Sequence, residues 1–117
     1  MSSRFDTGVL DRALVRKRQE RERVRRGVQA RALRLLDESP VDVGEAILFG
    51  SVVRPGQFDA ESDVDVAIPA VAPRAYFALM GHLEDGLGRD VDLVTIDSCH
   101  FADAIRRTGL RWTGTRT

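Results

Sequence analysis

The sequence predicts a single domain of the α/β (α+β) class with a long helix at its N-terminus. Three observations support this: a proline-free stretch of strong helix formers lies near the start, three short apolar segments resemble strands, and an amphipathic segment separates the second strand from the third. A length of 117 residues suits one domain with a modest core. We expect an Arg-rich helical arm over residues 1–38 and a globular domain over residues 39–117.

Composition excludes several classes of protein. Apolar residues make up 43% of the chain and charged residues 31%, which is typical of a globular rather than a disordered chain. No apolar run approaches the roughly 20 residues that span a bilayer, and Met1–Gly8 lacks the apolar core of a signal peptide. The single cysteine, Cys99, excludes an internal disulfide and is compatible with a reducing compartment. We therefore expect a cytoplasmic protein without a membrane segment.

Residues 9–38 are predicted to form one helix, which stops before Ser39 because the residue before a proline disfavours the helical conformation. The middle of this stretch, R-K-R-Q-E-R-E-R, offers almost nothing to bury, whereas the C-terminal part has apolar residues at helical spacing. We expect a more exposed N-terminal half, with Gly27 as a candidate break. The residues expected to anchor the helix are Val28, Ala32, Leu35 and Leu36.

The charge of the chain is unevenly distributed, although its net value is zero. Residues 1–40 hold eleven Arg and Lys against six Asp and Glu, and residues 41–117 hold seven against twelve. Three interpretations of the Arg-rich helix stay open: nucleic-acid binding, docking on a partner protein, or a merely solvated helix. Within it, Glu22 is spaced for i,i+4 pairs with Arg18 and Arg26, which contribute only about 0.2–0.5 kcal/mol each.

The remaining elements follow from apolar periodicity and from the glycines and prolines between segments. In the second strand, Val64 alternates with Asp63 and Asp65, so apolar and acidic side chains are expected on opposite faces of the sheet. Tyr76 and Trp112 are interpreted as core or interface residues. We predict strands over residues 45–49, 64–68 and 91–96, helices over 51–53, 73–87 and 101–107, and a final strand or tail over 110–112.

Three carboxylates form a candidate metal site. Asp63 and Asp65 occupy alternate positions and therefore point the same way, and Asp92 lies in the third strand segment, D-V-D-L-V. Magnesium prefers hard oxygen ligands and is often held by one or two carboxylates together with substrate phosphates. The three residues are therefore predicted to hold two magnesium ions and to act in catalysis. Asp92 is preferred over Asp90 because it lies deeper in the apolar strand.

A Gly-Ser turn precedes the first two carboxylates. Gly50 lets the backbone approach a triphosphate closely, and Ser51 supplies N–H and hydroxyl groups at the start of a helical turn. Arg54 is near enough in sequence to add positive charge to the same phosphates. An isolated Asp-x-Asp is usually a solvated strand edge, and Gly-Ser alone is only a turn. Their combination with a third Asp-bearing strand indicates phosphoryl chemistry.

The sequence resembles a known family in these motifs. Gly-Ser, eleven residues, D-V-D, and a later D in D-V-D-L-V are similar to the minimal nucleotidyltransferases (MNT) of the polymerase-β superfamily, the antitoxins of HEPN/MNT toxin–antitoxin pairs. The resemblance covers about residues 32–112, and F-G-S-V-V-R-P-G departs from the family pattern by one added residue, Pro55. It implies a mixed sheet flanked by helices. It also implies metal ligands at Asp63, Asp65 and Asp92, and a triphosphate-binding pair at Gly50 and Ser51.

The same resemblance implies an activity and a partner. The expected reaction is magnesium-dependent transfer of AMP from ATP to a hydroxyl group of a HEPN-type toxin, which silences the toxin's RNase activity. Little chain remains for an acceptor pocket, which favours an acceptor presented by another protein in a hetero-oligomer. Two alternatives stay open: an antitoxin that acts by binding alone, and a small-molecule (antibiotic-type) nucleotidyltransferase whose acceptor pocket a homodimer would complete.

Overall fold

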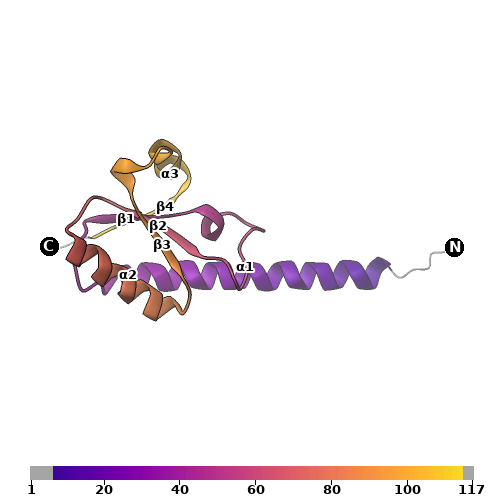
Figure 1. Cartoon of the computed structure of the whole chain (residues 1–117). Coiled ribbons are helices and arrows are strands. Elements are labelled where there is room, and N and C mark those ends of the chain that lie inside the picture. Colours follow the sequence, from indigo (N-terminus) through magenta and orange to yellow (C-terminus); the bar gives the residue numbers. More distant parts are fainter. Residues whose placement is uncertain (1–6, 115–117) are drawn as a thin grey trace.

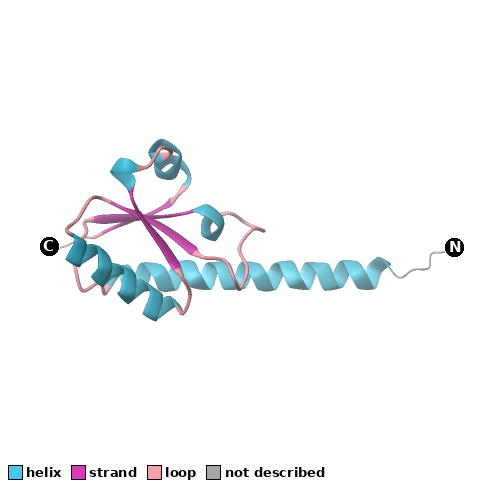
Figure 2. Cartoon of the chain, viewed as in Figure 1, coloured by secondary structure: helices cyan, strands magenta, loops and turns pink. Residues whose placement is uncertain are grey.

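The computed structural model describes residues 7–114 and has a four-stranded mixed sheet with helices on both faces (Figures 1 and 2). The predicted fold class is therefore confirmed, including the long N-terminal helix. The elements in chain order are α1 (Thr7–Asp37), β1 (Glu45–Phe49), the 3-10 turn η2 (Gly50–Val53), β2 (Val64–Ile68), α2 (Pro73–Leu87), β3 (Val91–Thr95), the 3-10 turn η3 (Ile96–Ser98), α3 (Ala102–Thr108) and β4 (Leu110–Thr113).

The sheet has the strand order β3-β2-β1-β4. β1 lies antiparallel to both β2 and β4, whereas β2 and β3 are parallel. The parallel pair is connected by α2, because two parallel neighbours need a long crossover rather than a tight turn. This topology brings the two acidic segments of the sequence onto adjacent strands.

The two faces of the sheet have separate cores. α1 and α2 cover one face, and α3 covers part of the other (Figure 1). Alternation along β2 explains the division, because Val66 packs in the core under α1 and α2 and Ala67 packs in the core under α3. Trp112 packs against the first core, and its indole N–H donates to the Asp37 carboxylate over 2.8 Å.

α1 is one continuous helix, so the predicted break at Gly27 is wrong. A glycine inside a helix costs only about 1 kcal/mol relative to alanine, and the neighbouring helix formers outweigh that cost. The C-terminal half enters the core with Ala32 and Leu36, both almost fully buried, whereas the N-terminal half projects beyond the sheet (Figure 1). Leu10 and Leu14 on this projecting half are 63% and 53% exposed. The division of the chain at residue 38 stays a prediction.

Element bounds differ slightly from the predictions. The third strand ends at Thr95 because Ile96 turns away into η3, where it is buried beneath α3. The first 3-10 turn starts at Gly50, one residue before the predicted helix. The final segment is a strand paired with β1 rather than a tail. Within residues 7–114, no helix combines the length and apolar character that a membrane crossing requires.

Candidate active site

Asp65 and Asp92 lie side by side on the parallel strands β2 and β3. The register pairs them directly, and it pairs Asp65 with Phe49 of β1 on its other side. Directly paired residues point to the same face of a sheet, and here this is the face that carries α3. Asp63 precedes β2 by one residue and shares this face by alternation. Asp63 and Asp92 are exposed, whereas Asp65 is half-buried.

The half-buried Asp65 carries unbalanced negative charge. Burial raises the pKa of its carboxyl group, the negative charges of Asp92 and Asp63 raise it further, and Arg54 offsets part of the effect. A site where like charges raise a pKa is a site where a cation would be stabilised. This cluster of negative charge therefore fits a divalent metal at these carboxylates.

The carboxylates do not form a complete metal cage by themselves. Among residues 7–114, no three Asp, Glu, His or Cys side chains converge closely enough to enclose an ion. Magnesium does not require such a cage, because it keeps several water ligands and shares substrate phosphates with one or two carboxylates. The arrangement suits a metal that arrives with a nucleotide.

Gly50 brings the backbone of the turn against the Asp65 carboxylate. It has a φ of 75°, and a Cβ atom placed on it would overlap the Asp65 side chain. Both facts exclude a larger residue, because positive φ is strained for L side chains and the carboxylate would have to move. The sequence predicted that Gly50 allows close approach of a triphosphate, and the structure adds that it allows close approach of Asp65.

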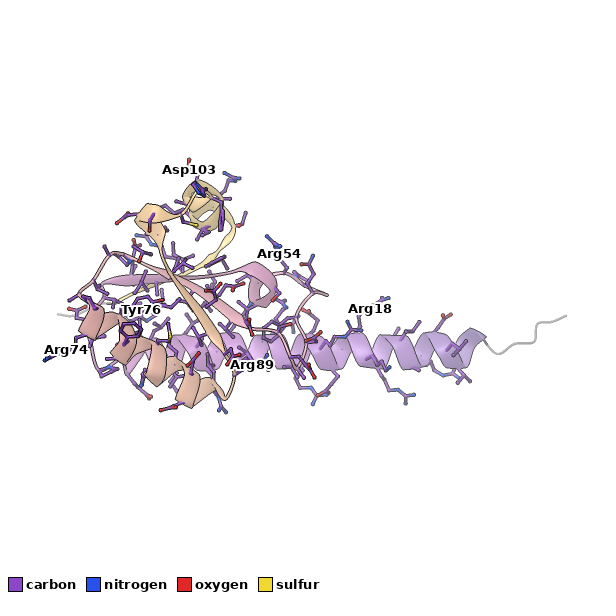
Figure 3. All side chains as sticks on the ribbon, viewed as in Figure 1. Arg18, Arg54, Arg74, Tyr76, Arg89 and Asp103 are labelled. Carbon is purple, nitrogen blue, oxygen red and sulfur yellow. The ribbon has the colours of Figure 1, made fainter. Side chains whose placement is uncertain are left out.

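Ser51 and Arg54 stand at the two ends of the same turn. Ser51 is partly buried, and its carbonyl accepts the Arg54 N–H over 3.0 Å. The Arg54 side chain is exposed, and Figure 3 shows it on the α3 side of the sheet. With Phe49 and Gly50 from β1 and η2, it lines a cavity of about 260 Å³ that α3 closes on its far side. Gly50 and Arg54, two of the three predicted phosphate-binding residues, therefore lie close to the Asp65 carboxylate, and Ser51 directly follows Gly50.

The loop that leads into Asp63 is held by residues that the sequence did not single out as functional. Phe58 is 1% exposed, and the Arg89 guanidinium lies 4.7 Å from its ring centroid. Arg89 also donates to the carbonyl oxygens of Ser62 over 2.8 Å and Asp59 over 3.1 Å. Because Arg89 directly precedes the segment that carries Asp92, it connects the starts of the two acidic strands. The only local sequence feature that could have indicated this arrangement is Phe58, an apolar residue in a polar turn.

α2 fixes the position of β3 through two polar contacts. The Tyr76 hydroxyl donates to the Leu93 carbonyl over 2.6 Å, and the Glu84 carboxylate accepts the Val91 N–H over 3.1 Å. The interpretation of Tyr76 as a core residue is confirmed, since it also packs against the core under α1 and α2. These contacts fix the backbone on both sides of Asp92.

Comparisons with known proteins agree with this arrangement. No curated protein sequence matches the chain. A toxin–antitoxin crystal structure with AMP-PNP shares 27% identity and a TM-score of 0.55, over 74% of this chain and 73% of that chain. Two mutant forms of a MntA-HpeT toxin–antitoxin complex share 26% identity, with TM-scores of 0.53 and 0.51, over 71% and 75% of this chain and 70% and 73% of theirs. A family model for the nucleotidyltransferase domain matches residues 30–110, and the chain therefore belongs to the nucleotidyltransferase domain family.

Proposed function

We propose that this protein transfers AMP from ATP, with magnesium, to a hydroxyl group of a partner protein, and that it acts as the antitoxin of a HEPN-type RNase toxin. The observation that carries the proposal is the packing of the Gly50 backbone against Asp65, which itself pairs with Asp92. This packing supports the proposal, because a turn suited to phosphate binding then lies next to carboxylates suited to magnesium. The similarity to toxin–antitoxin structures, one of them with AMP-PNP, supports the nucleotide and the partner class.

In this proposal the carboxylates and the turn have different roles. Asp63, Asp65 and Asp92 hold magnesium, which when bound neutralises phosphate charge during the in-line displacement. The N–H groups of Gly50 and Ser51 and the Ser51 hydroxyl bind the β- and γ-phosphates. Asp92 accepts the proton of the acceptor hydroxyl. The acceptor oxygen bonds to the α-phosphorus, the bond from that phosphorus to the bridging oxygen breaks, and pyrophosphate leaves.

Co-expression with the toxin tests the biological part of this proposal. Wild type is expected to restore growth, whereas Asp63→Asn and Asp65→Asn are expected to leave the toxin active because the magnesium ligands are lost. Asp90→Asn is the matched control, since Asp90 is an exposed carboxylate near Asp92 whose side chain has no proposed role. If both variants neutralise the toxin as well as wild type does, the protein acts by binding alone and the enzymatic proposal fails.

A further inference from the structure

Arg25 is a buried charged residue that links α1 to the candidate phosphate-binding turn. It is 8% exposed, and no other charged side chain in residues 8–114 is buried to this extent. Its Nη1 donates to the Val52 carbonyl over 3.2 Å, and the side-chain amide of Gln29 donates to the same oxygen over 2.8 Å. Val52 lies in η2 between Ser51 and Arg54, so two residues of α1 hold the middle of the turn.

Glu22 extends the contact to Gly56, in the loop that follows η2. Its carboxylate accepts three bonds from the Arg25 guanidinium, over 3.0 and 3.2 Å from Nε and 2.7 Å from Nη2, and one from the Gly56 N–H over 3.1 Å. The predicted i,i+4 pairs of Glu22 with Arg18 and Arg26 are therefore replaced by an i,i+3 pair. The local sequence could not predict that Glu22 pairs with Arg25. The Arg25 side chain is held in place by its hydrogen bond to the Val52 carbonyl, which lies 27 residues away in the sequence.

We infer that Glu22, Arg25 and Gln29 are positioning residues for the nucleotide, and that α1 is an integral part of the nucleotide site. The inference rests on the proposed function, because it takes the Gly50–Val53 turn to bind phosphates. A 3-10 turn of four residues has poor hydrogen-bond geometry and little stability of its own. The α1 side chains satisfy its Val52 carbonyl and the Gly56 amide, so they fix where Ser51 and Arg54 stand.

The chain offers a matched control for this inference. Glu20 and Arg23 form a second i,i+3 pair on the same helix, with their side chains 58% and 76% exposed. Removing either pair changes the charge and helix propensity of α1 by the same amount. Only the Glu22–Arg25 pair reaches η2 and the loop after it. A difference between the two sets of variants therefore reports on the turn and not on the helix.

Two measurements test the inference in the full chain. Amide hydrogen exchange at Arg54 and Gly56 reports the order of the loop, with Val66 in β2 as the internal reference. We expect Arg25→Met and Glu22→Gln to speed loop exchange about tenfold and to raise KM for MgATP about tenfold, with kcat nearly unchanged, because ground-state and transition-state binding are lost together. Arg25→Lys keeps a donor for the Val52 carbonyl, so its loop exchange rate and its KM should lie between those of wild type and Arg25→Met. Arg23→Met and Glu20→Gln should match wild type.

The outcomes separate this inference from the proposed function. Equal loop exchange and equal KM in the Arg25→Met and Arg23→Met variants would overturn the inference. If Arg25→Met does not fold, Glu22→Gln decides the question, because the substitution keeps the size of the side chain. Failure of wild type to bind MgATP in a calorimetric titration would instead overturn the proposed function.

Discussion

Gly50 is required both for the backbone conformation of the turn and for the packing of the candidate site. Its positive φ starts the turn, and its missing Cβ leaves room for the Asp65 carboxylate. The sequence could indicate Gly50, Ser51 and the acidic residues as candidate site residues, because the short motifs that contain them are suited to phosphate and metal binding. It could not show that Asp65 would sit between Gly50 and Asp92, since that depends on strand order and register.

Substitution of Gly50 tests its two constraints, the positive φ and the close packing against Asp65. We expect Gly50→Ala to lower the free energy of unfolding by about 2–3 kcal/mol and to abolish nucleotidyl transfer, because positive φ costs roughly 1–2 kcal/mol and the overlap with Asp65 adds to it. Gly44→Ala is the matched control, because Gly44 has a φ of 83° with nothing within 4 Å of a Cβ atom. It should lose about 1–2 kcal/mol and keep its activity. Urea denaturation with activity assays measures both effects. Equal losses of stability and activity in the two variants would contradict the close packing at Gly50.

At the level of elements, α1 shows what local sequence patterns predict and what they miss. Its length, its exposed first half and its buried anchors Ala32 and Leu36 followed from composition and spacing. The contacts of Arg25 and Gln29 with η2 did not, because they join segments more than twenty residues apart. The end of β3 was misplaced for a related reason, since Ile96 is apolar in sequence but packs under α3 instead of continuing the ladder.

The contact between α1 and the turn predicts a pH dependence of stability. The pKa of Glu22 falls from 4.5 to about 2 in the folded protein, chiefly because Arg25 donates to its carboxylate, and also because of the Gly56 N–H. Since the folded pKa lies below the unfolded one, this stabilisation is fully present above about pH 4.5 and is lost as the pH falls toward 2. The Gln side chain does not titrate, so the difference in unfolding free energy between wild type and Glu22→Gln should shrink across this window.

Urea denaturation at fixed ionic strength, repeated across the same pH window, measures this difference. Glu20→Gln serves as the control, because Glu20 pairs with Arg23 on the exposed side of the helix. The difference between the two variants therefore reports the contacts of Glu22 with Arg25 and Gly56 and not the loss of one charge from the helix. A gap between wild type and Glu22→Gln that stays constant as the pH falls would contradict the assignment of this titration to Glu22.

On the scale of the whole molecule, the long helix packs against the sheet and α2, and it also contacts η2 of the candidate site. α1 has 31 residues, which at 1.5 Å per residue is about 46 Å, whereas the molecule measures 28 and 25 Å across its two shorter axes. One end of the helix therefore packs under the sheet while the other extends past it, with Arg18 on the projecting part (Figure 3). The uneven charge is read directly from the sequence, and the sequence also predicted that the N-terminal half of α1 is exposed. The position of the turn against the middle of this helix required the tertiary structure.

The central claim is nucleotidyl transfer at the carboxylates, and the fate of the ATP phosphorus atoms tests it most directly. The full chain, magnesium and the proposed partner, a purified HEPN-type toxin, are incubated with ATP labelled at either the α- or the γ-phosphorus. The account predicts that the toxin gains the α label, that the γ label leaves in pyrophosphate, and that Asp92→Asn stops the transfer while Asp90→Asn does not. Gain of the γ label, or α-label transfer that is equal in wild type and Asp92→Asn, would contradict the account.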